Sequence, residues 1–237
     1  MEIAISDSAE FKSLLEALAD ELTDASDHFK LHQNINAAIS EYAIEFNQSP
    51  VFWTMTRSAH MDAVLIRLCK SYDLYDGKPS LNLKSFLETI NANLSIFDEP
   101  NFRERLKENP FVHSLAAHSR KPDPARLAKD LESVSICDPL VKKLTIWRHN
   151  YLAHRSRMSA LNPIAFAEKN PILFSDIEAL INNGLRLVNY YSDLFNATHH
   201  LSLESKDYKH LLEAVRRDLE ARERHLQGQI RKALKAK

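Results

Sequence analysis

Glycine is scarce in this chain, with 3 residues in 237, where an average protein has roughly 7%. Stretches of alternating Val, Ile and Thr are also few, and together these shortages argue against a β-sheet. No apolar run reaches the roughly 18 residues of a transmembrane helix, so we expect no membrane span. The first residues, MEIAISDSAEF, lack the apolar centre of a secretory signal. We therefore expect a cytoplasmic protein.

Cysteine is almost absent too. Cys69 and Cys137 form neither a CxxC motif nor a disulfide framework, which fits a reducing compartment. We expect both thiols to be small buried apolar groups. His28 and His32 have the i,i+4 spacing of metal ligands, but the sequence suggests no third ligand nearby. We expect these imidazoles on a solvated face, and we expect no metal and no cofactor.

The residues that are present favour an all-α fold. Hydrophobic residues make up 44% of the chain, and many recur at helical spacing. The pattern predicts helices over residues 7–23, 27–46, 51–75, 80–96, 125–133, 175–198 and 207–234. Residues 160–171, with two Asn-Pro pairs, are expected to form a loop. The helix over 51–75 is apolar nearly all round, which is typical of the centre of a bundle.

Charge is distributed unevenly, although the net charge is only −1. Residues 1–47 carry ten acidic side chains and two basic ones, whereas residues 206–237 carry ten basic and five acidic ones. We expect three parts: an acidic helical pair over 1–47, a helical core over 48–200 and a basic amphipathic helix over 201–237. The two ends could dock on each other or serve solubility, or the basic helix could gather RNA phosphates.

One stretch concentrates polar chemistry. Residues 141–158 read VKKLTIWRHNYLAHRSRM, after an Asp138-Pro139 pair that is typical of a helix start. Arg148 and His154 are six positions apart, so on a continuous helix their side chains would point in directions about 120° apart. They therefore cannot form an i,i+4 pair on one face. They could both line one broad groove. A guanidinium suits phosphate oxygens, and an imidazole can move protons near pH 7. This combination suits a phosphodiester.

The segment from Arg148 to His154 resembles the R-x(4–6)-H signature of HEPN domains (higher eukaryotes and prokaryotes nucleotide-binding). In that signature a polar residue follows the arginine, and His149 holds this position here. The run from Phe52-Trp53 to Tyr72-Asp73 is similar to the abortive-infection U-type (AbiU-like) branch. The similarity covers roughly residues 40–200. It implies a HEPN-like helical bundle, here with additional N- and C-terminal helices. It also implies a dimer that, in active members, cleaves RNA without a metal.

The resemblance makes Arg148, His149, Asn150 and His154 the expected catalytic residues of a toxin or abortive-infection effector. We expect substrate contacts from Arg155, Arg157, Arg57 and Tyr151. The implied partners are RNA, a second copy of the chain and an antitoxin protein. Two alternatives stay open: a catalytically inactive RNA- or protein-binding module, and a purely structural role in which Arg148 pairs within the bundle.

Overall fold

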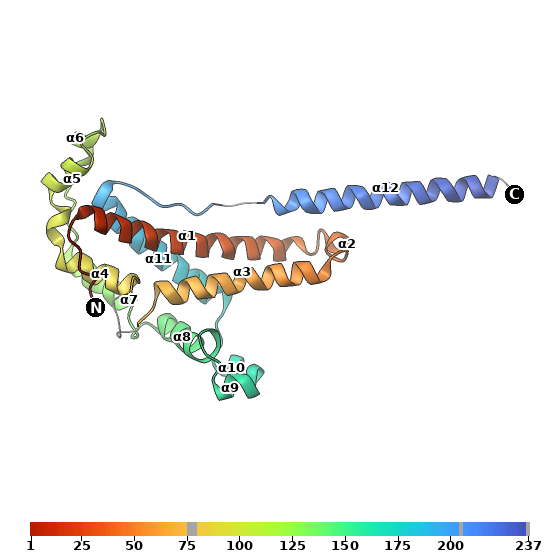
Figure 1. Ribbon diagram of the computed structural model, residues 1–237, viewed down its shortest axis with the longest axis horizontal. Coiled ribbons are helices and arrows are strands. Elements are labelled where there is room, and N and C mark those ends of the chain that lie inside the picture. Colours follow the sequence, from red (N-terminus) through yellow and green to blue (C-terminus); the bar gives the residue numbers. More distant parts are fainter. Residues whose placement is uncertain (75–79, 204–205, 236–237) are drawn as a thin grey trace. The chain divides into compact units, whose positions relative to one another are not determined.

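The computed structural model describes residues 1–74, 80–203 and 206–235 (Figure 1). The described residues form twelve α-helices, one 3-10 helix and one π-helical turn, with no β-strand. The all-α prediction is confirmed. The α-helices are α1 (Ser8–Ala38), α2 (Ala43–Phe46), α3 (Pro50–Ser71), α4 (Leu83–Ala92), α5 (Glu99–Arg105), α6 (Val112–Leu115), α7 (Pro124–Ser133), α8 (Pro139–Trp147), α9 (Arg157–Leu161), α10 (Pro163–Lys169), α11 (Phe174–Asn196) and α12 (Tyr208–Lys235).

The chain forms two compact units. Unit 1 comprises residues 1–26 and 63–202, and unit 2 comprises residues 27–62 and 203–237. The helices α1 and α3 each contribute residues to both units. The three-part organisation with boundaries at 47/48 and 200/201 stays a prediction.

An aromatic cluster forms the centre of unit 1. The Phe11 ring stacks on Phe86 at a centroid distance of 5.4 Å and meets Phe97 and Phe195 edge-on at 5.6 and 4.8 Å. All four side chains are fully buried, and such ring pairs add stability beyond their buried area. This core joins the start of α1 to α4, the 3-10 helix (Leu94–Phe97) and the end of α11.

Gly184 allows α1 and α11 to approach closely in unit 1. A Cβ atom at this position would lie 2.6 Å from Leu22 Cδ2, well inside van der Waals contact. Leu22 itself is fully buried. The sequence leaves two roles open for a glycine inside an apolar helix, a stop or a close contact, and the structure shows the close contact.

Unit 2 has a smaller core, made by α2, α12 and the parts of α1 and α3 that belong to this unit. Trp53 and Phe46 meet edge-on at 4.8 Å, and Tyr42 donates a hydrogen bond of 2.6 Å to Glu213 on α12. The other buried members of this core are Ile35, Ala38, Tyr208 and Leu212. Beyond Arg222 every described side chain of α12 is exposed. The basic helix is therefore packed at its start only.

The first predicted helix and the first part of the second form one helix, whereas the end of the second forms the separate helix α2. Asp7 caps α1 as expected, since its carboxylate accepts hydrogen bonds from the Ala9 and Glu10 amides at 2.8 and 2.9 Å. The helix then continues to Ala38, and the predicted break after Thr23 is wrong. Residues 24–26 contain neither glycine nor proline, so no residue there forces the helix to end.

The expectation that α3 is covered all round is also wrong. Val51, Phe52, Met55 and Ile66 are each about half exposed or more. The helix begins at Pro50, one residue before the predicted start, and ends at Ser71. The predicted end at Tyr75 lies outside the described residues. Arg67, one of its polar residues, forms ion pairs with Glu21 and Asp24 in unit 1.

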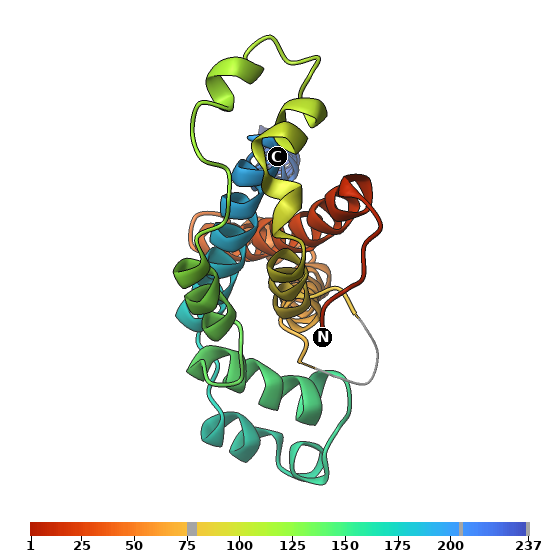
Figure 2. The ribbon, with the colours of Figure 1, turned by 90° about the vertical axis from the view of Figure 1, so that its left-hand side faces the viewer.

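Residues 160–171 are not a loop. They contain the end of α9 and the whole of α10, which lie beyond α8 in unit 1 (Figures 1 and 2). Pro163 occupies the first turn of α10, where its missing N–H costs nothing. The Asn162-Pro163 pair therefore ends α9 and also starts α10.

Two further expectations about single residues are wrong. Cys69 is buried, but Cys137 is exposed. In unit 2, His28 and His32 do not lie on a solvated face: the Nδ1 atoms of His28 and His60 are 2.8 Å apart, and His32 Nδ1 lies 3.0 Å from the carbonyl oxygen of Arg57. Both imidazoles are thus engaged within their unit.

The helices were also compared with the length and hydropathy that a membrane span requires. None of them, in the described part of the chain, meets both requirements.

Candidate active site

The helix α8 holds the candidate motif at its C-terminal end. Asp138 caps α8 as predicted, accepting hydrogen bonds from the amides of Leu140 and Val141 at 2.8 and 3.1 Å. Lys143 forms an ion pair of 2.9 Å with Asp176 at the start of α11. Trp147 Nε1 donates to the carbonyl oxygen of Asn170 at 2.6 Å. These contacts fix both ends of α8 within unit 1.

The motif itself begins where α8 stops. Arg148–Leu152 wind as a π-helical turn, closed by a hydrogen bond of 2.9 Å from the Ala153 amide to the Arg148 carbonyl oxygen. The segment from Arg148 to His154 is therefore not a continuous α-helix. The angle of about 120° expected between these two side chains does not apply to it. Single π turns are rare in proteins and frequently occur at functional sites.

Asn150 stabilises this turn through both its side chain and its backbone. Its Nδ2 donates to the Ile146 carbonyl oxygen at 2.8 Å. Its own carbonyl oxygen accepts hydrogen bonds from the Ser156 amide, at 3.0 Å, and from the Ser159 hydroxyl. These contacts tie the π turn to the start of α9. A catalytic role for Asn150 stays a prediction.

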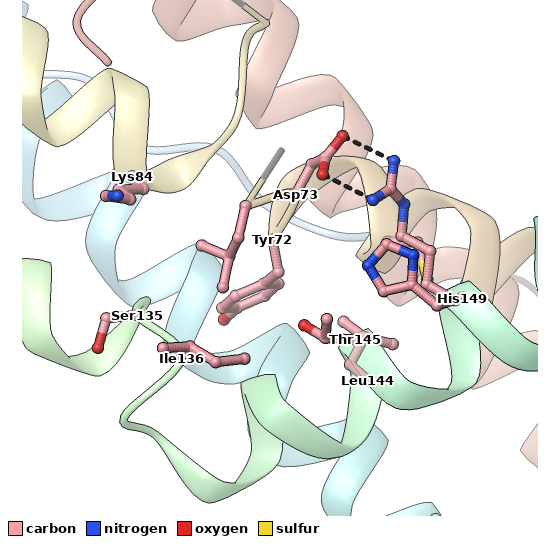
Figure 3. A pocket seen from close by; sticks show the side chains of 11 residues that line it. Tyr72, Asp73, Lys84, Ser135, Ile136, Leu144, Thr145 and His149 are labelled. Carbon is pink, nitrogen blue, oxygen red and sulfur yellow. Dashed lines mark hydrogen bonds and ion pairs between the residues drawn. The ribbon is translucent and has the colours of Figure 1, made fainter. Parts of the chain in front are cut away.

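The Arg148 guanidinium is held by a carboxylate. Its two terminal nitrogens lie 2.9 Å from the two oxygens of Asp73, in a bidentate fork (Figure 3). The side chains are 27% and 18% exposed, so the pair is partly shielded from solvent. Such forks fix the orientation of a guanidinium as well as neutralising it. Asp73 follows α3 and thus joins the two parts of the sequence that carry the HEPN resemblance.

Two cavities share this ion pair as a wall. The large cavity, of about 420 Å³, is also lined by Lys84, Thr145 and His149 (Figure 3). The small cavity, of about 220 Å³, lies between the end of α3 and the π turn and is lined by Ile66, Lys70, Leu152 and Ala153 as well as the pair. Arg148 therefore adjoins two separate hollows.

Cys69 lines both cavities, but it is poorly suited to be a nucleophile. Burial raises the pKa of its thiol to about 12, with a smaller opposing effect from Arg148. At neutral pH the group is therefore a thiol, and the thiolate is the reactive form. Tyr72 lines the large cavity and donates a hydrogen bond of 2.7 Å to the Leu180 carbonyl oxygen, which fixes its ring.

The predicted histidines take different positions. His149 lines the large cavity and is exposed. His154 follows the π turn with an exposed side chain, and among the described residues it lines neither cavity. The structure thus brings Arg148 and His149 together, and the relation of His154 to them as a catalytic pair stays a prediction.

Three of the four predicted substrate-binding residues belong to unit 1, and the fourth, Arg57, belongs to unit 2. Tyr151 packs edge-on against Trp147 at 5.3 Å, and the Arg155 guanidinium lies 5.8 Å from the Tyr151 ring centroid. Arg157 is exposed at the start of α9. Arg57 belongs to unit 2, where its buried Nε has no hydrogen-bond partner among the described residues. Substrate contacts from these four side chains stay predictions.

Sequence reasoning missed three residues of the site. Asp73 lies inside the run that resembles the AbiU-like branch, so its position was a usable signal, but its partner could not be read from the pattern. Lys84 and Thr145 line the large cavity on α4 and α8, and nothing in their local sequence sets them apart. Within the described residues, no three His, Cys, Asp or Glu side chains group as a metal site.

Comparison with known proteins supports the resemblance over nearly the whole chain. No match was found among curated proteins, and none among solved structures. The family model of AbiU2, a HEPN family, matches residues 8–221. The match includes α1 to α11, the π turn and the first half of α12. The chain therefore belongs to the AbiU2 family of HEPN domains, which links it to abortive infection.

Proposed function

We propose that this protein is a metal-independent endoribonuclease that acts in the cytoplasm as a toxin or abortive-infection effector. The observation that carries the proposal is the π turn of the HEPN motif, which presents Arg148 at the border of two cavities. The Asp73 fork orients the guanidinium there. Membership of the AbiU2 family is consistent with such an activity.

RNA supplies its own nucleophile, the ribose 2′-OH, so the protein need not provide one. His154 would take the proton of that hydroxyl or give one to the leaving 5′-oxygen. Arg148 would stabilise the charge that builds on the phosphorane, and His149 would orient the phosphate. The P–O5′ bond breaks as the O2′–P bond forms. The products would carry a 2′,3′-cyclic phosphate and a 5′-OH, and DNA would not be cut.

A second copy of the chain is part of this proposal. His154 is exposed and lies outside both cavities of its own chain, so one motif by itself does not show a closed arginine–histidine site. Two motifs that meet across a symmetric dimer would supply one. An antitoxin protein that binds this surface would restrain the activity.

The test is cleavage of end-labelled single-stranded RNA in the presence of a chelator. Wild-type protein should cut, leave cyclic-phosphate ends and lose its activity in the His154→Ala variant. The matched control is His118→Ala, since His118 is also exposed but lies outside the motif. Equal cleavage by wild type and His154→Ala, or loss of cleavage in the chelator, would contradict the proposal.

A catalytically inactive RNA- or protein-binding module is the second candidate. It is favoured by the Asp73 fork, because a guanidinium already neutralised by a carboxylate has less charge to offer a transition state. In that case wild type and His154→Ala would both fail to cut RNA. Binding would persist and weaken as salt increases.

A further inference from the structure

The large cavity has features that the cleavage chemistry does not use. Its walls come from the end of α3, the start of α4, the α7–α8 connection and α8. The apolar part of the wall comprises Cys69, Tyr72, Leu74, Ile136 and Leu144. A volume of about 420 Å³ lies within the range of small-molecule pockets, about 300–1,000 Å³.

Charged groups stand at two sides of this cavity. Lys84 projects from α4, and in Figure 3 it lies across the cavity from His149, with Tyr72 between them. Among the described residues, Lys84 forms one ion pair, with Glu88 on the same helix, and its length of 3.9 Å is the limit of such a pair. Within the described residues, the charge of Lys84 is therefore only loosely compensated.

Hydrogen-bonding groups complete the lining. The hydroxyls of Ser135 and Thr145 lie on the wall beside the apolar residues. The Thr145 hydroxyl donates to the Val141 carbonyl oxygen at 2.9 Å, which leaves its lone pairs as acceptors. The lining thus combines an apolar wall and a few polar groups with Lys84 on one side and the Arg148–Asp73 ion pair on the other. This combination matches an unpaired nucleotide, whose base is flat and whose phosphates are anionic.

We infer that the large cavity is a nucleotide subsite that takes one unpaired nucleotide next to the phosphate at Arg148. The base lies against Ile136 and Leu144, Thr145 and Ser135 contact its edge, and Lys84 binds the phosphate on the far side of that nucleotide. The inference rests on the proposed function for the identity of the ligand. It adds Lys84 as a substrate-binding residue and makes the cavity a source of sequence preference.

Calorimetry with the full-length protein tests the nucleotide subsite. It measures the binding of the four nucleoside 3′-monophosphates and of inorganic phosphate. At least one nucleotide should bind more tightly than phosphate. Ile136→Trp should fill the cavity and abolish that advantage, since Ile136 is 49% exposed and tolerates a larger side chain. The control is Ile164→Trp on α10, outside the cavity, where the isoleucine is 74% exposed.

Lys84→Met should weaken nucleotide binding by about tenfold, whereas Lys142→Met, an exposed lysine of α8 outside the cavity, should not change it. The inference is overturned if no nucleotide binds better than phosphate, or if each variant behaves like its control.

Cleavage assays on the same proteins separate the two proposals. If Ile136→Trp cleaves RNA with the base preference of the wild type, the proposed nuclease activity is supported and the nucleotide subsite is rejected. Nucleotide binding that depends on Ile136 and Lys84, without any cleavage, would retain the subsite and reject the nuclease.

Discussion

The Asp73 carboxylate and the Arg148 guanidinium, 75 residues apart in sequence, face each other through two parallel contacts of 2.9 Å. Both side chains are less than one-third exposed. The contact ties the end of α3 to the π turn, so the orientation of the motif arginine depends on a residue outside the motif.

Asp73→Asn should lower the rate of RNA cleavage without weakening RNA binding. The amide keeps one acceptor but places an N–H₂ group against the guanidinium, so the fork is lost. A misplaced catalytic group costs about 100-fold in rate, whereas loss of one negative charge leaves phosphate binding equal or tighter. Separate measurements of kcat and KM check this, with Glu99→Gln, in an exposed pair with Arg103, as control. An unchanged kcat would show that Asp73 does not position Arg148.

Arg148→Ala and His154→Ala should each abolish growth inhibition when the protein is expressed in bacteria. Both residues belong to the proposed catalytic group, and His154 is exposed, so its removal should not affect folding. Circular dichroism and the mass in solution should match the wild type. Full toxicity of both variants would remove the motif from the mechanism, and His118→Ala should remain toxic throughout.

Gly184→Ala should destabilise unit 1. The added methyl group would lie 2.6 Å from Leu22 Cδ2, and a buried leucine has little room to move, so we expect a loss of about 1–3 kcal/mol. Thermal unfolding should show a lower Tm. Gly228→Ala on α12 is the matched control, because a Cβ atom added there would have no neighbour within 4 Å. That change should raise helix stability by up to about 1 kcal/mol, and a Tm decrease of the same size in both variants would contradict the packing argument.

Acid should destabilise unit 2 through His60. Burial, and then the nearby His28 and His32, lower the pKa of His60. The folded protein therefore binds fewer protons than the unfolded chain, and the stability contributed by the neutral imidazole is complete above the ordinary histidine pKa, near 6.5. This stability is lost as the pH falls from the ordinary histidine pKa through the lower pKa of His60 in the folded protein.

Urea unfolding at pH 7.5, 6.5 and 5.5 tests this prediction. Wild type should lose stability across the series more steeply than His60→Gln. The exposed His210 on α12 provides the control, since His210→Gln should keep the wild-type slope. Parallel curves for wild type and His60→Gln would show that His60 does not couple folding to pH in this range.

Much of the fold could be predicted because its signals are local. Asp123-Pro124 and Asp138-Pro139 each place a capping carboxylate before a first-turn proline, and both start helices in the structure. The errors also have local causes. The Asn162-Pro163 pair does end a helix, as expected. The expectation of a loop is wrong because proline is equally suited to the first turn of a helix, which is where Pro163 lies.

The candidate site was harder to predict because its geometry is not local. Arg148 and His149 could be chosen from chemistry and family resemblance, but the partner of Arg148 is 75 positions away and shares no periodic pattern with it. Lys84 reaches the same cavity from α4. The π turn was missed because the helical periodicity before Arg148 gives no sign of where the hydrogen bonding changes.

The π turn also bears on how this motif tolerates length variation. A hydrogen bond from Ala153 to Arg148 encloses one residue more than an α-helical bond would. An insertion or deletion between the arginine and the histidine can therefore be absorbed by exchanging one kind of turn for another, while α8 and α9 keep their places. Such an exchange of turns permits a spacing of four to six residues between the arginine and the histidine.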